Sequence, residues 1–253
     1  MYITSKLLFN DSKNFFIKNF WIIFLISLFS ALIAMTISYF IDPEYRKLSI
    51  FYEMNKYNTN YLFTKIQSMH VSEQKILFRL LFSKISSYLI ANTILLSGVI
   101  GILELFFLNK NNSWKKKIYK MIIFFPDLLL MVIVLTIIVQ FGSMIFIIPG
   151  LFIFSLLSLS PIILFTEEKN VIFSIKKSIS ISFKNMRFIF PSIMFWIFSK
   201  SIVLIISFIT NTIISPYSNI FLLYGINNLL LSFLIIYLFR FYIFFINEDR
   251  DFL

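Results

Sequence analysis

Apolar runs of about 20 residues alternate along the chain with shorter basic or polar segments. A helix rises 1.5 Å per residue and the hydrocarbon core is about 30 Å thick, so such a run is long enough to cross a bilayer. The pattern predicts an all-α polytopic membrane protein, with one integral membrane domain over residues 1–246 and a short polar cytoplasmic tail over 247–253. About six spans are expected, at residues 20–41, 86–108, 121–141, 144–165, 188–209 and 219–241.

The third and fourth spans form a predicted hairpin. No charged residue occurs from Leu128 to Thr166, a stretch too long for a single span. The tetrad Gln140–Ser143 is the turn-like sequence in a suitable place, so the reversal is expected there. Pro149-Gly150 is the one cue for a broken helix of the kind that transporters use.

The first span has an alternative interpretation as a signal peptide, because three Lys residues precede it. The apolar run is longer than the core of a signal peptide, and no small-x-small cleavage site precedes Asp42. A retained span is therefore favoured.

The basic residues indicate the orientation of the chain. Lys and Arg prefer cytoplasmic loops, and with the N-terminus inside, fifteen of them fall in cytoplasmic segments and seven outside. Both termini are therefore expected in the cytoplasm. All seven Lys and Arg residues on the outer side lie in the loop 42–85, so the sequence leaves open which side of the membrane this loop occupies. The net charge of +11 is clumped between the spans, which indicates topology rather than nucleic-acid binding.

A segment between the fourth and fifth spans has the period of an amphipathic helix. Ile172, Ile175, Ile179 and Phe183 recur at spacings of three and four. We expect an in-plane helix with its basic residues at the lipid headgroups. The headgroup contacts expected are Lys176, Lys177, Lys184 and Arg187. The alternative is a cytoplasmic helix packed on other loops of the same protein.

Three ionisable residues fall within or near the spans and are candidates for an intramembrane polar site, because charge at membrane depth is costly. Lys200 is expected near the midplane of the fifth span, where it could bind an anion or lipid phosphate or serve as an interhelical tie. The tie is favoured. Glu104 and Asp127 lie near the cytoplasmic ends of their spans, where partners such as nearby Lys residues or headgroups are the simpler interpretation.

Composition restricts the chemistry further. With 59% hydrophobic and 14% charged residues the chain is unlike a soluble domain, and one His, no Cys and five Gly leave little for thiol or metal chemistry. No catalytic motif is found, so no catalytic, cofactor or metal site is expected. The leading hypothesis is a non-catalytic protein that acts through lipid or protein contacts in envelope maintenance. Membrane lipids are the expected partners, together with a membrane protein or a second copy of the chain. The alternative is a small-solute transporter or lipid translocator that uses Lys200 and the Pro149-Gly150 break.

Several motifs in combination resemble a known family. They are Tyr2-Ile3-Thr4, Asp11 to Phe16, Ile148-Pro149-Gly150 with Pro161, Lys184 to Arg187, and Ile236 to Arg240. Together they resemble the YciC family of uncharacterised bacterial inner-membrane proteins, over nearly the whole chain to about Ile246. The resemblance implies six spans and an inner (plasma) membrane location. The region from Pro149 to Arg187 is also similar to the membrane domain of some glycerophosphodiester phosphodiesterases, but their catalytic domain has no counterpart in this sequence, so their activity is not implied.

Overall fold

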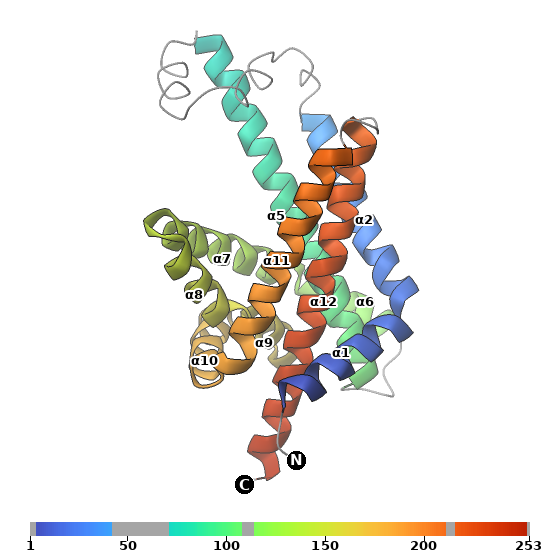
Figure 1. Ribbon diagram of the computed structural model, residues 1–253, viewed down its shortest axis with the longest axis vertical. Coiled ribbons are helices and arrows are strands. Elements are labelled where there is room, and N and C mark those ends of the chain that lie inside the picture. Colours follow the sequence, from blue (N-terminus) through green and yellow to red (C-terminus); the bar gives the residue numbers. More distant parts are fainter. Residues whose placement is uncertain (1–3, 42–70, 108–113, 211–215, 252–253) are drawn as a thin grey trace.

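The structure is a computed structural model that describes residues 4–41, 71–107, 114–210 and 216–251. All regular structure in these ranges is helical (Figure 1). The helices are α1 (Ser5–Lys18), α2 (Phe20–Ile41), α5 (Val71–Phe107), α6 (Trp114–Ile123), α7 (Phe125–Ile145), α8 (Ile147–Leu157), α9 (Ser160–Glu167), α10 (Val171–Lys184), α11 (Met186–Thr210) and α12 (Pro216–Asp251).

Six segments are long and apolar enough to cross a membrane, which confirms the predicted fold class. They are Phe20–Ser38, Leu77–Phe107, Phe125–Ile145, Ile147–Glu167, Met186–Thr210 and Asn219–Ile246. The fourth of them consists of α8 and α9 together.

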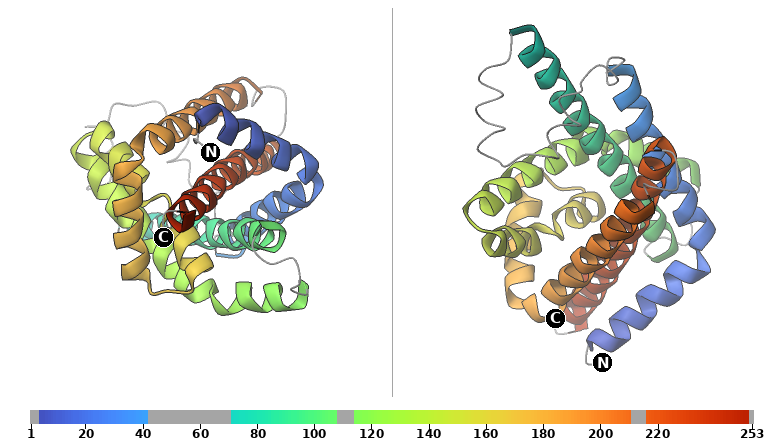
Figure 2. Two further views of the ribbon diagram at one scale, coloured as in Figure 1. Left: turned by 90° about the horizontal axis from the view of Figure 1, so that it is seen from below. Right: turned by 45° about the horizontal axis from the view of Figure 1, so that its top comes forward.

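Four helices, α2, α5, α11 and α12, run roughly along the long axis of the molecule, whereas α7 and α10 run across it (Figures 1 and 2). The helices α1, α6 and α10 and the end of α12 all lie in the lower half of Figure 1. These elements belong to the basic segments that were assigned to one side of the membrane. Their common location agrees with that grouping. The compartment that this end faces stays a prediction, and residues 42–70 lie outside the described part.

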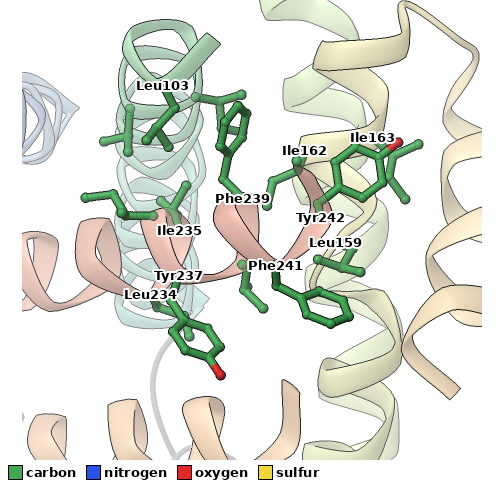
Figure 3. Close-up of a cluster of buried hydrophobic side chains, with 14 of the residues drawn as sticks. Leu103, Leu159, Ile162, Ile163, Leu234, Ile235, Tyr237, Phe239, Phe241 and Tyr242 are labelled. Carbon is green, nitrogen blue, oxygen red and sulfur yellow. The ribbon is translucent and has the colours of Figure 1, made fainter. Parts of the chain in front are cut away.

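The second half of α12 is the centre of the core. From Leu234 to Phe239 every side chain is at most 5% exposed, so this stretch is covered on all sides. Figure 3 shows its side chains pointing towards α5 on one side and towards Leu159, Ile162 and Ile163 on another. A helix that is apolar all round belongs either in a protein core or in lipid, and in this half of α12 the neighbouring helices provide the cover.

Small side chains let α2 approach α5 and α12 closely. Four small residues of α2 are buried, namely Ser27, Ser30, Ala31 and Ala34. Ser30 donates to the carbonyl of Ala91 in α5 at 2.7 Å, and Asn228 of α12 donates to the carbonyl of Ser27 at 3.1 Å. Side-chain hydrogen bonds of this kind hold helices together where lipid offers no hydrophobic drive. The segment weighed as a signal peptide is thus packed within the bundle.

The turn of the central hairpin lies beyond the predicted tetrad. Gln140–Ser143 is helical, and the chain reverses at Phe146, whose φ of −156° and ψ of 153° are extended. The reason is packing. A Cβ added to Gly150 would lie 2.8 Å from Cα of Ser143, and one added to Gly142 would lie 3.3 Å from Cα of Gly150. Gly142 therefore lets the two arms touch and does not form the turn.

The prediction of a helix break at Pro149-Gly150 is also wrong, because both residues lie within α8. Pro149 lies in the first turn of α8, where a missing N–H leaves no helical hydrogen bond unmade. The fourth span is interrupted instead at residues 158–159, just before Pro161 in the first turn of α9. Proline there cannot donate to the carbonyl four residues earlier, which ends α8.

Other boundaries differ from the predicted spans by a few residues. The second span starts earlier than predicted, because residues 71–107 form one continuous helix, the 37-residue α5. The third span starts at Phe125 because residues 114–123 form the separate helix α6. The expected polar tail is helical as far as Asp251, as a continuation of α12.

Candidate functional site

The helix α10 leaves apolar side chains uncovered. Ile172, Ile179 and Phe183 are 69%, 39% and 67% exposed, and we call these three residues the apolar stripe. They recur along one side of α10 at the helical spacing. Large apolar side chains gathered in this way mark a surface that meets lipid or another protein.

The opposite side of α10 attaches it to the bundle. Ser174, Ser178 and Ser182 are fully buried, and we call them the serine face. Ser178 donates to the carbonyl of Leu156 in α8 at 2.7 Å. Serines are small enough for the helices to come close, and their hydroxyls can bond to backbone carbonyls. The serine face and Ile181 make the protein contacts of α10, and the apolar stripe lies on the other side of the helix. The location of α10 in the plane of the headgroups stays a prediction.

Three of the four predicted headgroup contacts are exposed, namely Lys176, Lys184 and Arg187. Lys176 follows Ile172 by four residues and so lies one turn along the same side of the helix. Arg187 lies just beyond α10, at the start of α11, and its guanidinium is 4.7 Å from the centre of the Phe188 ring. The outward side of α10 therefore combines apolar and cationic groups.

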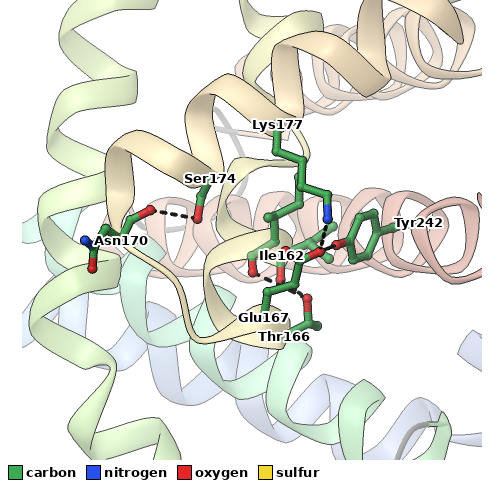
Figure 4. A network of polar contacts seen from close by, with 8 residues as sticks. Ile162, Thr166, Glu167, Asn170, Ser174, Lys177 and Tyr242 are labelled. Atoms are coloured by element: carbon green, nitrogen blue, oxygen red, sulfur yellow. Dashed lines mark hydrogen bonds and ion pairs between the residues drawn. The ribbon is translucent and has the colours of Figure 1, made fainter. Parts of the chain in front are cut away.

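The fourth predicted headgroup contact, Lys177, is turned inward. Its ammonium pairs with Oε1 of Glu167, the same oxygen that accepts a hydrogen bond from the hydroxyl of Tyr242 (Figure 4). Glu167 is the last residue of α9, and the backbone of Glu168 after it lies in the left-handed region, with a φ of 55°. Lys177 thus links α10 to α9 and α12, and the predicted headgroup role does not fit its position.

Three further ion pairs join helices around this network. Lys120 of α6 pairs with Glu104 of α5 at 2.8 Å and with Glu168 at 2.7 Å, and Arg240 of α12 pairs with Asp11 of α1. We call these pairs and the Lys177–Glu167 pair the ion-pair layer. It joins α1, α5, α6, α9, α10 and α12. Pairs shared among so many helices serve the architecture rather than a ligand.

The three candidates for an intramembrane polar site are not brought together. Glu104 pairs with Lys120, in keeping with its interpretation as an interfacial residue. Asp127 is exposed in the first turn of α7. The ammonium of Lys200 lies 5.2 Å from the ring centre of Trp196, one turn earlier in α11. Within the described ranges no carboxylate pairs with Lys200, and its role as an interhelical tie stays a prediction.

Among the described residues, no group of three or more His, Asp or Glu side chains could hold a metal ion. The chemistry that the outward side of α10 offers is the attraction of anions beside an apolar surface.

Several features of the site were missed from the sequence. α1 was not predicted, although Thr4 accepts a hydrogen bond from the Leu7 amide as an N-cap and Leu8, Ser12 and Phe15 have helical spacing. Tyr242 carries no local signal of its bond to Glu167, since 75 residues separate them.

Comparison with known proteins gives one family. The sequence model of the uncharacterised protein family UPF0259 matches residues 1–244. A UPF0259 membrane protein of Buchnera aphidicola subsp. Acyrthosiphon pisum (strain APS) is 37% identical, covering 98% of this chain and 100% of the relative. One from Pectobacterium carotovorum subsp. carotovorum (strain PC1) is 30% identical, covering 96% and 98%. No solved structure matches. The chain belongs to the family UPF0259, the YciC family that its motifs resemble.

Proposed function

We propose that this integral membrane protein is non-catalytic and binds anionic phospholipid at the cytoplasmic surface of the bacterial inner membrane. In this proposal α10 lies in the plane of the headgroups, both termini are cytoplasmic, and the lipid contacts serve maintenance of the envelope. A membrane-protein partner would bind on the same membrane surface.

The observation that carries the proposal is the outward side of α10. Its apolar stripe is uncovered while its serine face is docked, so the helix is fixed with apolar groups directed away from the protein. Covering a large aliphatic or aromatic side chain stabilises by about 1.5–3 kcal/mol. Each basic residue near an anionic surface adds about 1 kcal/mol. Lys176, Lys184 and Arg187 supply that charge.

The transporter alternative has less support. A transport pathway built on Lys200 would place polar partners around it at depth, but Glu104 pairs with Lys120 and Asp127 lies in another exposed position. The fourth span is interrupted at residues 158–159, next to buried apolar residues, and not at Pro149-Gly150.

The proposal is tested with a double variant, Lys176→Gln and Lys184→Gln, in nanodiscs of mixed phosphatidylglycerol and phosphatidylcholine. We expect the variant to lose most of the enrichment in phosphatidylglycerol that native mass spectrometry finds on the ejected protein. Glutamine removes the charges without adding negative ones, and Lys177 is kept because it pairs with Glu167.

The matched control changes two exposed cations at the other end of the molecule, Lys75→Gln and Arg79→Gln in α5. Its enrichment should equal that of the wild type. An equal loss in both double variants would mean that total charge, and not α10, selects the lipid, and the proposal would be rejected.

A further inference from the structure

A groove of about 350 Å³ lies between α1, α11 and α12. Its walls are mainly aromatic and aliphatic, with Phe9, Phe195, Trp196, Phe233 and Tyr237 among them. Figure 3 shows Tyr237 on the side of α12 away from Phe239, and the Tyr237 hydroxyl donates to the carbonyl of Phe188 in α11 at 3.2 Å. The size is within the range of pockets that take small organic ligands.

One wall of the groove belongs to the least buried span. The span Met186–Thr210 has the smallest buried share of the six candidate spans. Phe195 is 52% exposed and Phe9 is 39% exposed, so the groove opens between side chains that the protein leaves uncovered. In a membrane protein, such a side opening faces acyl chains.

The groove has polar groups at defined places. Lys6 lines it from the first turn of α1, is exposed, and has no ion pair among the described residues. The indole N–H of Trp196 is buried and finds no hydrogen-bond acceptor in the part of the chain that the structure describes. Because the protein covers this nitrogen, it is not a contact point for a ligand in the groove.

The length of the groove along the helices is about 12 Å, since it extends from Pro191 to Ser199 and a helix rises 1.5 Å per residue. Pro191 and Tyr237 lie towards the end of the bundle that holds the start of α11 and the end of α12. Ser199 and Leu230 lie deeper in the two spans. The groove thus extends from this end of the bundle inward along the two spans, with Lys6 among its lining residues.

We propose that this groove holds part of one acyl chain of an anionic phospholipid, with the lipid phosphate at the Lys6 ammonium. The inference rests on the proposed function only in placing the protein among anionic lipids. It uses α1, α11 and α12, whereas the proposed function uses α10.

The test uses Trp196 as the reporter in the full chain. Trp21→Phe and Trp114→Phe leave Trp196 as the single tryptophan of the three. This protein is reconstituted in phosphatidylcholine vesicles that contain a small fraction of either phosphatidylglycerol or phosphatidylcholine with brominated acyl chains. We expect the brominated phosphatidylglycerol to quench Trp196 fluorescence about fivefold more effectively, the advantage that one basic residue near an anionic lipid gives.

Two pairs of variants locate the effect. Lys6→Gln should bring the two lipids to equal quenching, while Lys176→Gln with Lys184→Gln should leave the preference intact even if the α10 proposal fails. Ser199→Phe, inside the groove, should reduce quenching by both lipids, and Ser201→Phe, exposed on the same helix, should not.

Equal quenching by the two lipids in the single-tryptophan protein would overturn the inference. A stable dimer that protects Trp196 from both lipids would overturn it as well, because a second copy of the chain would then cover the groove.

Discussion

At the scale of single residues, neighbours with the same charge have different roles. Lys176 is exposed on α10, whereas Lys177, one residue later, pairs with Glu167 beneath the helix. Successive residues point about 100° apart around a helix, so a run of lysines cannot be assigned to one surface without knowing which side is docked. The side that is docked depends on serines, which a hydrophobic pattern ignores.

The Glu167 network gives a prediction about stability. Glu167→Gln should lower the free energy of unfolding by about 1–3 kcal/mol, because Lys177 loses its counter-ion and Tyr242 loses a charged acceptor. Thermal unfolding in detergent, followed by circular dichroism, measures the change. Asp127→Asn removes the same charge from an exposed position and serves as the control. Equal destabilisation by the two variants would show that the network does not stabilise the fold.

At the scale of elements, the hairpin of α7 and α8 shows how one residue type can be misinterpreted. A glycine in a short polar sequence such as Gln140–Ser143 is typical of a turn. Gly142 is nevertheless buried within α7 and contacts Gly150 across the hairpin. Only the second arm, folded back, reveals that role. The actual turn at Phe146 has no glycine or proline of its own, and no local signal marks it.

The close contact in the hairpin makes Gly150→Ala informative. The added Cβ would lie 2.8 Å from the Ser143 backbone, so the arms must separate, at a cost of about 1–3 kcal/mol that exceeds the gain of up to about 1 kcal/mol from better helix propensity. Gly225→Ala is the matched control, because nothing lies within 4 Å of its added Cβ. A melting temperature lowered only by Gly150→Ala is expected. If both variants were equally stable, the arms could not be as close as the structure has them.

At the scale of the whole molecule, the number of spans could be predicted from the sequence, and so could the grouping of the basic segments at one end of the bundle. Both follow from properties that each segment carries itself, namely apolar length and charge. The ion pair Arg240–Asp11 could not be predicted, because it joins α12 and α1, which lie at opposite ends of the chain. The groove likewise requires α1 to lie against α11 and α12, which no local pattern indicates.

The measurement to make first is the depth of α10 in the bilayer. The chain has no cysteine, so single cysteines at Ile172, Ile179, Phe183, Lys176 and Lys184 each carry one spin label in reconstituted vesicles. We predict that labels on the apolar stripe collide more with oxygen than with an aqueous nickel chelate, and that labels at the two lysines show the reverse. High nickel accessibility at all five positions would place α10 in water and contradict an in-plane lipid-binding helix.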